Sequence, residues 1–249
     1  MTIDPSLVAE IAPRGVLRAS INLGNPVLAS SRTSPEQPAG VTVDLARDFA
    51  RRLGVTVECV CFPRAADAGE AVANGTTDIA FLAVDPDRAQ TLAFTHPYVL
   101  IEGAYVVGTD SPLQAQHEVD RDGVEVVVGS GSAYDLFLRR HLKHAQLTRV
   151  ALSEQVVDEA LRRPGSVAAG VRQQLEADLA RLSATGKPAL RMLDGRFMVI
   201  EQAAAMARSR SAAALAVLAK FIDEAVASGF VADALARHSI EGASVAPPR

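Results

Sequence analysis

One arginine of this chain lies a few residues after an apolar segment. Residues 79–84, Ile-Ala-Phe-Leu-Ala-Val, have the composition of a buried strand, and the chain then turns through Asp85, Pro86 and Asp87 to Arg88. A guanidinium at the end of a strand can bind a carboxylate through two parallel hydrogen bonds. A surface ion pair with Asp85 or Asp87 accounts for the same residues, so the spacing leaves two roles open for Arg88.

A segment rich in glycine and serine is the second candidate for chemistry. In VVVGSGSAYD, residues 126–135, a strand pattern turns into a helix pattern. The backbone N–H groups of such a turn favour an anion, and Ser130 and Ser132 add hydroxyl groups. A nucleotide is disfavoured, because Tyr134 stands where a dinucleotide site needs its third glycine and no P-loop lysine follows. The segment predicts a small-anion or carboxylate site, or else a plain tight turn with Ser132 as a helix N-cap.

Other kinds of chemistry find little support in the sequence. Cys59 and Cys61 alternate along a strand-like segment, so their side chains share a face, where we expect buried free thiols. No histidine or second cysteine pair stands at zinc-site spacing, so we expect neither a metal nor a cofactor. The serines around Gly131 do not match the GxSxG pattern of a nucleophile elbow.

Composition narrows the class of protein further. Of 249 residues, 49% are hydrophobic and 22% charged, as in globular proteins. The net charge of −4, the scattered basic residues and the absence of tryptophan disfavour nucleic acid as a partner. No apolar window is long enough to span a bilayer, and the N-terminus lacks the features of a secretory signal. We therefore expect a chain that is made without a leader or whose leader has been removed.

The elements that must position Arg88 alternate between strand and helix. A short helix is expected first, capped by Asp4. Strands are then predicted at residues 15–21, 55–62 and 78–84, with helices at 41–54 and 66–75 between them. This order predicts a parallel sheet with right-handed crossovers, whose ligands bind beyond the carboxyl ends of the strands. His96, beside Pro97, is expected in a turn.

A second series of strands and helices follows a cluster of chain-breaking residues. Gly108, Asp110 and Pro112 end a predicted strand, and they mark the expected crossing into a second domain. Strands and helices alternate again from residue 124, and Ser153 is expected to cap one of the helices. A long amphipathic helix is predicted at residues 210–229.

Taken in order, these segments resemble the family 3 solute-binding proteins, the amino-acid type of ABC-transporter substrate-binding protein. The resemblance rests on GVLRASIN, GVTVDLARDFARRLGV, ANGTTDIAF, DPDRAQTLAFTHPY, VVVGSGSAYD and ASGFVADAL. It implies an α/β, two-lobed type II periplasmic binding fold, in which each lobe is a mostly parallel sheet flanked by helices. Lobe 1 would comprise residues 1–107 and 200–249 and lobe 2 residues 108–199, with hinges near 107–110 and 195–200.

The resemblance also implies a ligand site in the cleft between the lobes. Arg88 would form a salt bridge with the carboxylate of the ligand, and Ser132 with its turn would be the contribution of the second lobe. The full predicted set of ligand-binding residues is Asn22, Asn25, Phe81, Arg88, Ser130, Gly131, Ser132, Tyr134, Arg172, Gln173 and Gln202.

Two departures from the family pattern bear on the ligand. Amino-acid binders of the family usually place small hydroxyl residues or glycine where this chain has Phe81, Leu82 and Ala83. The position of the acid that takes the ligand's ammonium group holds Gly170, and Arg172 follows it. Compared with the family pattern, the site therefore lacks an acid and has an additional base. This difference predicts that the ligand is a small carboxylate, or another anionic or polar solute, in place of an ordinary α-amino acid.

The predicted function is binding without catalysis, as the monomeric substrate-binding component of an ABC-type uptake system with a membrane permease as its partner. One alternative is an enzyme resembling the cyclohexadienyl dehydratases, in which Glu201 would be the acid. Another is a cytoplasmic sensor module, which would need a partner domain. The resemblance predicts a periplasmic protein if a leader was removed, and a cytoplasmic one if this is the native start.

Overall fold

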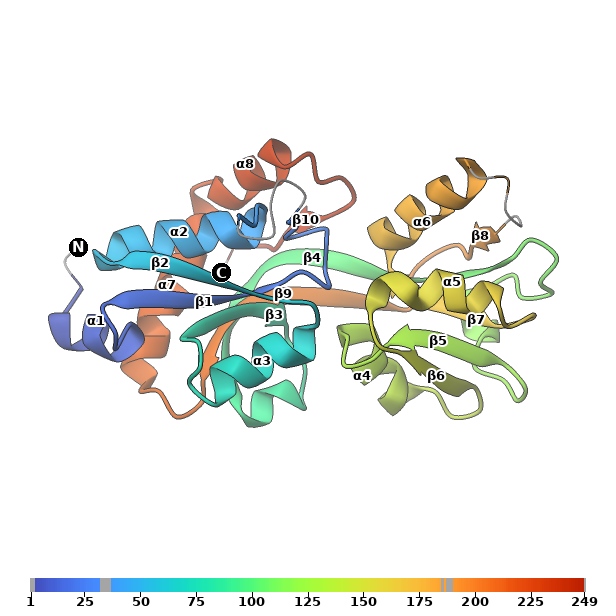
Figure 1. Ribbon diagram of the computed structural model, residues 1–249, viewed down its shortest axis with the longest axis horizontal. Coiled ribbons are helices and arrows are strands. Elements are labelled where there is room, and N and C mark those ends of the chain that lie inside the picture. Colours follow the sequence, from blue (N-terminus) through green and yellow to red (C-terminus); the bar gives the residue numbers. More distant parts are fainter. Residues whose placement is uncertain (1–2, 32–36, 185, 187–189, 249) are drawn as a thin grey trace. The chain divides into compact units, whose positions relative to one another are not determined.

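The computed structural model describes residues 3–31, 37–184, 186 and 190–248, and contacts divide the chain into two units (Figure 1). Unit 1 comprises Met1–Leu100 and Glu201–Arg249, and unit 2 comprises Ile101–Ile200. The chain leaves unit 1 within strand β4 (Leu92–Gly108) and returns within β9 (Met198–Ala207). The predicted hinge ranges stay a prediction, because a hinge is a change of backbone torsions between two forms.

The sheet of unit 1 begins with three parallel strands. Its order is β2-β1-β3-β9, and then the first part of β4. The strands are β1 (Val16–Asn22), β2 (Thr56–Phe62) and β3 (Ile79–Ala83). Strand β1 pairs in parallel with both β2 and β3, whereas β9 runs antiparallel to β3, and β10 (Ser244–Val245) pairs with β4. The parallel sheet expected from the first three strands is confirmed.

Helices cover both faces of this sheet. Because α2 (Val41–Leu53) and α3 (Ala65–Ala73) connect strands in opposite directions along the sheet, right-handed crossovers place them on opposite faces, as Figure 1 shows. Leu82 of β3 packs toward α3. Helix α2 ends at Gly54, whose φ of +74° is the left-handed conformation that glycine supplies at a helix end.

The remaining helices of unit 1 are formed by the two ends of the chain. Helix α1 (Pro5–Ile11) begins at the predicted cap, since the carboxylate of Asp4 accepts the Ser6 N–H at 2.8 Å. Helix α7 (Ala212–Ala227) contacts both α1 and α8 (Phe230–Arg237). In the described ranges, no helix combines the length and apolarity needed to cross a membrane.

A buried ion pair between Arg18 and Asp78 connects β1 to the segment before β3. The Asp78 carboxylate is fully buried, and it accepts hydrogen bonds from the backbone N–H of Arg18 at 2.8 Å and from its Nε and Nη2 at 3.1 and 2.6 Å. The same guanidinium donates to the carbonyl of Gly75 at 3.1 Å. The Gly75–Asp78 segment, part of the family pattern, therefore has a structural role in this chain.

Strand β4 is longer than the sequence indicated. The predicted strand began at residue 103, whereas β4 begins at Leu92 and contains His96 and Pro97. The turn expected at His96 is therefore wrong, because proline fits a strand wherever the ladder does not need its missing N–H. The ring of His96 instead lies 3.3 Å from the carboxylate of Asp223 on α7.

Unit 2 repeats the α/β pattern on a smaller scale. Its parallel strands β5 (Glu125–Gly129), β6 (Gln146–Val150) and β7 (Val167–Val171) follow the order β7-β5-β6. The second part of β4 runs antiparallel to β7 and also pairs with β8 (Leu190–Met192).

Alternating side chains of β5 build two cores in unit 2. Val126 and Val128 pack with α4 (Ala133–His141), whereas Val127 packs with α5 (Val156–Leu161) and α6 (Arg172–Ala184).

The cap expected at Ser153 is wrong. A 3-10 turn, Ser153–Gln155, precedes α5, and Gln155 is the N-cap. Leu152 is the cap of this turn, and the side chain of Gln155 accepts the N–H of Leu152 at 3.1 Å, so Ser153 lies inside the turn and not at a cap.

Candidate functional site

The carboxyl ends of β1 and β3 meet at one edge of the unit 1 sheet, because these strands pair in parallel. Asn22 is the last residue of β1. Gln202, on the antiparallel β9, lies opposite Ala83, the last residue of β3. Arg88 follows β3, and its Nη1 donates to the Ala83 carbonyl at 3.0 Å. The fold therefore brings the predicted residues Asn22, Arg88 and Gln202 to the same edge.

Arg88 begins a single 3-10 turn, Arg88–Gln90, and is half-buried. Burial lowers the pKa of Arg88 to about 10, while the charge of Asp85 acts in the opposite direction. The guanidinium therefore stays charged at neutral pH in a place that is poor in water. A partly desolvated cation gains more from an added anion than an exposed cation does.

Asp85 fixes the turn that presents Arg88. Its carboxylate accepts the backbone N–H of Asp87 at 2.9 Å, and its carbonyl accepts the N–H of Ala89 at 2.9 Å. Only 4% of Asp85 is exposed, so it is a buried Asx-turn residue. The sequence assigned Asp85 only to a surface ion pair. The signal for its second role was the spacing of Asp85, Pro86 and Asp87, which is typical of an Asx turn.

The two asparagines after β1 differ in their hydrogen bonding. The side-chain oxygen of Asn22 accepts the N–H of Gly24 at 3.0 Å and so helps to shape the loop. Asn25 is 8% exposed, and its side-chain oxygen has no hydrogen-bond partner among the described residues. A buried acceptor without a partner costs free energy, so Asn25 is suited to receive a hydrogen bond from a solute.

Phe81 has a packing role in β3. It is 2% exposed, and its ring meets the ring of Tyr98 edge-on with centroids 6.0 Å apart. The Tyr98 hydroxyl has no hydrogen-bond partner among the described residues, and burial raises the pKa of Tyr98 well above its ordinary value. Contact of Phe81 with a ligand stays a prediction.

In unit 2, the glycine–serine turn lies between β5 and α4. The N–H of Ser130 donates to the carbonyl of Val150 at 2.9 Å, and Gly131 adopts a φ of +70° that favours glycine. The N–H of Gly131 donates to the Asp135 carboxylate at 2.9 Å. Ser132 is the N-cap of α4, and its hydroxyl accepts the N–H of Asp135 at 3.1 Å.

The carboxylate of Asp135 is therefore an anion from within the protein that binds to this turn. Its carboxylate is buried, and it also pairs with Nε of Arg149 at 2.9 Å. The sequence did not assign a role to Asp135, although the spacing of Ser132 and Asp135 is that of a capping box. The helix cap at Ser132 is therefore confirmed, whereas the small-anion site stays a prediction, since the carboxylate at the turn is that of Asp135.

Tyr134 supports the turn from within unit 2. It is 4% exposed and belongs to the core beside α4. Burial raises the pKa of Tyr134, while the hydroxyl groups of Ser153 and Ser132 act in the opposite direction. The predicted ligand contact of Tyr134 stays a prediction.

The ends of β7 and β5 lie at the same edge of the unit 2 sheet, because these strands are parallel. Arg172 follows β7 directly as the first residue of α6, and the half-buried Gln173 comes next. Nε of Arg172 donates to the Glu102 carboxylate at 2.8 Å, and Nη1 lies 3.0 Å from the sulfur of Met192.

Glu102 is shared between two arginines. Arg196 donates to it at 2.6 Å, and Arg196 together with Arg172 holds the pKa of Glu102 below its ordinary value. Arg172 therefore already has a carboxylate partner within unit 2.

Gly170 occupies a position with little space for a side chain. It is buried in β7, and a Cβ there would lie 3.2 Å from the side chain of Leu175. A carboxylate at position 170 would need Leu175 to move.

The remaining candidates for chemistry lie in ordinary surroundings. The Glu201 side chain is exposed, and its backbone carbonyl accepts the N–H of Val84 at 2.8 Å. Cys59 and Cys61 are free but half-buried, which corrects the expectation of full burial, since β2 is an edge strand. Burial raises the pKa of both thiols. The described residues include no group of three or more histidines, cysteines or acids placed to hold a metal ion.

Several known proteins are similar to this chain in fold. An amino acid ABC transporter substrate-binding protein from Streptococcus pneumoniae, bound to L-arginine, has a TM-score of 0.75 at 17% identity, over 93% of this chain and 98% of that one. An ancestral amino-acid-binding protein, described as a precursor of cyclohexadienyl dehydratase, has a TM-score of 0.73 at 18% identity, over 92% and 98%. At these identities the comparison shows a shared fold, the two-lobed type II periplasmic binding fold.

Sequence comparisons add a relative and a family. The membrane-bound lytic murein transglycosylase F of Maricaulis maris is 33% identical over 140 residues, which span 55% of this chain and only 30% of that protein. Residues 24–239, most of the chain, match the family described as bacterial extracellular solute-binding proteins, family 3. This chain therefore belongs to the bacterial extracellular solute-binding proteins of family 3.

Proposed function

We propose that this chain binds a small polar solute bearing a carboxylate, as the substrate-binding component of an ABC-type uptake system. Membership of the solute-binding family supports the binding role. The uptake system, and a permease as partner, are supported by similar proteins such as the arginine-bound one from Streptococcus pneumoniae.

The observation that supports a carboxylate on the ligand is the environment of Arg88. Its guanidinium is charged, half-buried and positioned by the Ala83 carbonyl at the strand edge where ligands of such sheets bind. A carboxylate that accepts two hydrogen bonds from it replaces the lost hydration with a charge-assisted pair. Asn25, with its unpartnered buried oxygen, adds an acceptor for a hydroxyl or amine of the solute.

Unit 2 supports a solute other than an ordinary α-amino acid. Gly170 leaves little space for an acid that would receive an ammonium group, and the nearby Arg172 adds positive charge, although Glu102 offsets it. Hydroxy acids, keto acids and dicarboxylates fit this arrangement better than lysine or arginine do.

The test is a thermal-shift screen of small carboxylates and all amino acids, followed by calorimetry on the best solute. We expect Arg88→Ala to weaken binding of that solute about 100-fold, because a charged anchor is lost. Arg64→Ala is the matched control, since Arg64 is a partly exposed arginine of unit 1 paired with Asp67. Tight binding of cationic amino acids alone, or an Arg88→Ala protein with unchanged affinity, would contradict the proposal.

A dehydratase remains the second candidate because one protein of the same fold is described as a dehydratase precursor. The residue to test is Glu201, whose exposed side chain is a weaker choice than a shielded acid. Incubation with prephenate distinguishes the two functions. Phenylpyruvate that forms with the wild-type chain and not with Glu201→Gln would establish the enzyme, whereas binding of solutes without turnover supports the binder.

A third candidate is a solute-binding module within a larger assembly. The observation that favours it is the transglycosylase, of which the similar region makes up only 30%. Uptake of the labelled best solute by cells with and without this chain separates the two roles. A fall in uptake that Arg88→Ala fails to restore supports transport, while unchanged uptake together with intact binding supports the module.

A further inference from the structure

Strand β2 lies at the end of the unit 1 sheet, so one of its two edges has no neighbouring strand among the described residues. In the order β2-β1-β3-β9, β2 pairs with β1 residue by residue, from Val16 opposite Thr56 to Asn22 opposite Phe62. Because this register runs without interruption, the backbone groups of β2 alternate regularly between the two edges. Pairing with β1 uses one set of these groups and leaves the other set for a second partner.

One hydrogen bond shows which backbone groups point to the open edge. The N–H of Leu23, the residue after β1, donates to the carbonyl of Phe62 at 2.8 Å. Phe62 and every second residue before it therefore face β1, whereas the N–H and C=O groups of Val57, Cys59 and Cys61 point outward. Within the described ranges of the chain, none of these outward groups has a hydrogen-bond partner.

The side chains of β2 favour pairing with a further strand. Its sequence, Thr-Val-Glu-Cys-Val-Cys-Phe, is rich in residues that occur often in strands, and Glu58 is its one charged residue. Natural edge strands commonly avoid association by carrying lysine, proline or several charges. The exposed residues of β2 are Thr56 and Glu58, and the other side chains are half-buried. The strand therefore has little of this protection.

The open edge is complementary to itself. Two copies of β2 can pair in antiparallel about a two-fold axis at Cys59, with Val57 of one copy opposite Cys61 of the other. Each outward N–H of one copy then meets an outward C=O of the other. The same register places Glu58 opposite Val60, so two carboxylates do not face each other directly.

The neighbouring residues end this register on both sides. Val55 and Pro63 are the next residues whose backbone groups point outward, and they would lie opposite each other. The N–H of Val55 already donates to the carbonyl of Ala50 at 3.1 Å, and proline has no N–H. The self-complementary segment therefore coincides with the 7 residues of β2.

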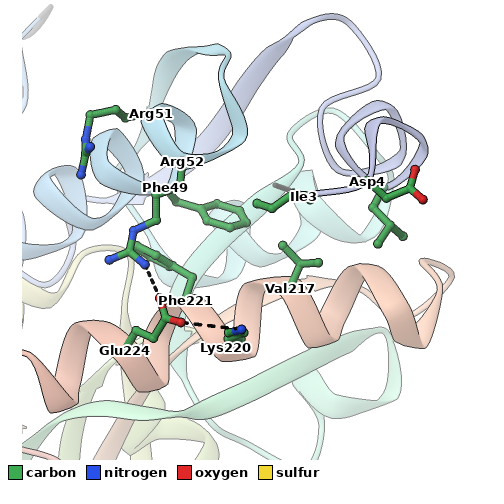
Figure 2. A pocket seen from close by; sticks show the side chains of 10 residues that line it. Ile3, Asp4, Phe49, Arg51, Arg52, Val217, Lys220, Phe221 and Glu224 are labelled. Atoms are coloured by element: carbon green, nitrogen blue, oxygen red, sulfur yellow. Dashed lines mark hydrogen bonds and ion pairs between the residues drawn. The ribbon is translucent and has the colours of Figure 1, made fainter. Parts of the chain in front are cut away.

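A cavity elsewhere in unit 1 differs from this edge, because its charged groups already have partners. The cavity is lined by residues of α1, α2 and α7, and Figure 2 shows Arg52 and Lys220 paired with Glu224. Arg51, also in the lining, pairs with Asp48. A bound molecule would gain little from these compensated charges, whereas a strand at the edge of β2 would gain unused hydrogen bonds.

We propose that β2 is a dimerisation surface, where two copies of this chain join their unit 1 sheets through an antiparallel β2–β2 pair centred on Cys59. Backbone hydrogen bonds supply the affinity, and the matched groups fix the register. The dimer replaces the monomer expected from the sequence. The proposal is independent of the solute site, because no residue of β2 belongs to the predicted solute-binding set.

The first test uses the two cysteines as markers of the register. In a hydrogen-bonded antiparallel pair, opposite Cα atoms lie about 5.5 Å apart, so Cys59 of one copy can form a disulfide with Cys59 of the other. The two Cys61 residues are separated by about 13 Å along the strands, which is too far. Oxidation with copper–phenanthroline should therefore give at least about tenfold more covalent dimer from Cys61→Ser than from Cys59→Ser.

The second test is analytical ultracentrifugation under reducing conditions, over a range of protein concentrations. Cys59→Pro removes an outward N–H from each copy and leaves the ladder with β1 intact, so it should weaken the dimer at least about tenfold. Cys59→Ala keeps this N–H, and as the matched control it should change the dimer less than about twofold. Circular dichroism checks that both variants are folded.

Three results would overturn the proposal. The first is a wild-type chain that stays monomeric up to about 1 mM. The second is equal cross-linking of the two single-cysteine variants, as random collisions produce. The third is a dimer that a folded Cys59→Pro variant leaves unchanged, which would assign the contact to another surface. If Cys59→Pro does not fold, the cross-linking comparison decides by itself.

Discussion

Arg88 in unit 1 and the polar groups of unit 2 occupy comparable places, after the carboxyl ends of parallel strands. In unit 2, two of these groups have a carboxylate from the chain itself, since Asp135 accepts the Gly131 N–H and Glu102 pairs with Arg172. In unit 1, the guanidinium of Arg88 donates to the Ala83 carbonyl, and burial affects its pKa more than the charge of the nearby Asp85 does.

The difference indicates that the two units contribute differently to solute binding. A cation that already shares a carboxylate gains little from a second anion, because its charge has been compensated. For Arg88, burial outweighs the charge of Asp85 in setting the pKa, so a bound anion should still stabilise the charged form. We therefore expect the charge of Arg88 to dominate solute affinity, and the unit 2 residues to contribute shape and hydrogen bonds.

The largest expected effect comes from removing the internal carboxylate of the turn. Asp135→Ala leaves the Gly131 N–H and Arg149 without this partner, and it should lower the free energy of unfolding by about 3 kcal/mol. Chemical denaturation measures this, with Asp122→Ala, whose carboxylate is exposed, as the control. If the turn is an anion site, sulfate or acetate should restore part of the lost stability of Asp135→Ala. A loss below about 0.5 kcal/mol would show that the comparison overstates Asp135.

A smaller effect is expected from exchanging each arginine for lysine. Arg88→Lys should weaken binding of the best solute about tenfold, because an ammonium cannot form the same pair of parallel hydrogen bonds. Arg172→Lys should change the affinity less than about twofold, because Glu102 already compensates this position. Calorimetry on both variants is the measurement. Equal losses of affinity in the two variants would contradict the proposed difference between the units.

The smallest effect concerns pH. The protonated fraction of Arg88 falls as the pH rises through its pKa of about 10, so affinity for a carboxylate solute should be constant from pH 7 to 9. At pH 10 it should be about twofold lower, since half of the Arg88 side chains are then neutral. Calorimetry with a neutral solute analogue is the control. A loss of affinity already near pH 8 would point to a different titrating group.

The sequence by itself determined the local features of the fold. The Asp4 cap, the left-handed Gly54 and the Ser132 cap depend on residues within a few positions along the chain, and each is present in the structure. The alternation of strands and helices predicted the parallel sheets for the same reason, because short-range periodicity decides which side chains are buried. The family resemblance extended this to the two-lobed fold.

Tertiary structure alone decided which of the predicted polar residues already have partners within the chain. Arg18 pairs with Asp78 across 60 positions of sequence, and Arg172 pairs with Glu102 across 70. Such pairs form only when distant segments are folded together. Residue type and spacing could therefore identify Arg88 and Arg172 as candidate ligand-binding residues. They could not show that Glu102 compensates the charge of Arg172, or that burial desolvates the charge of Arg88.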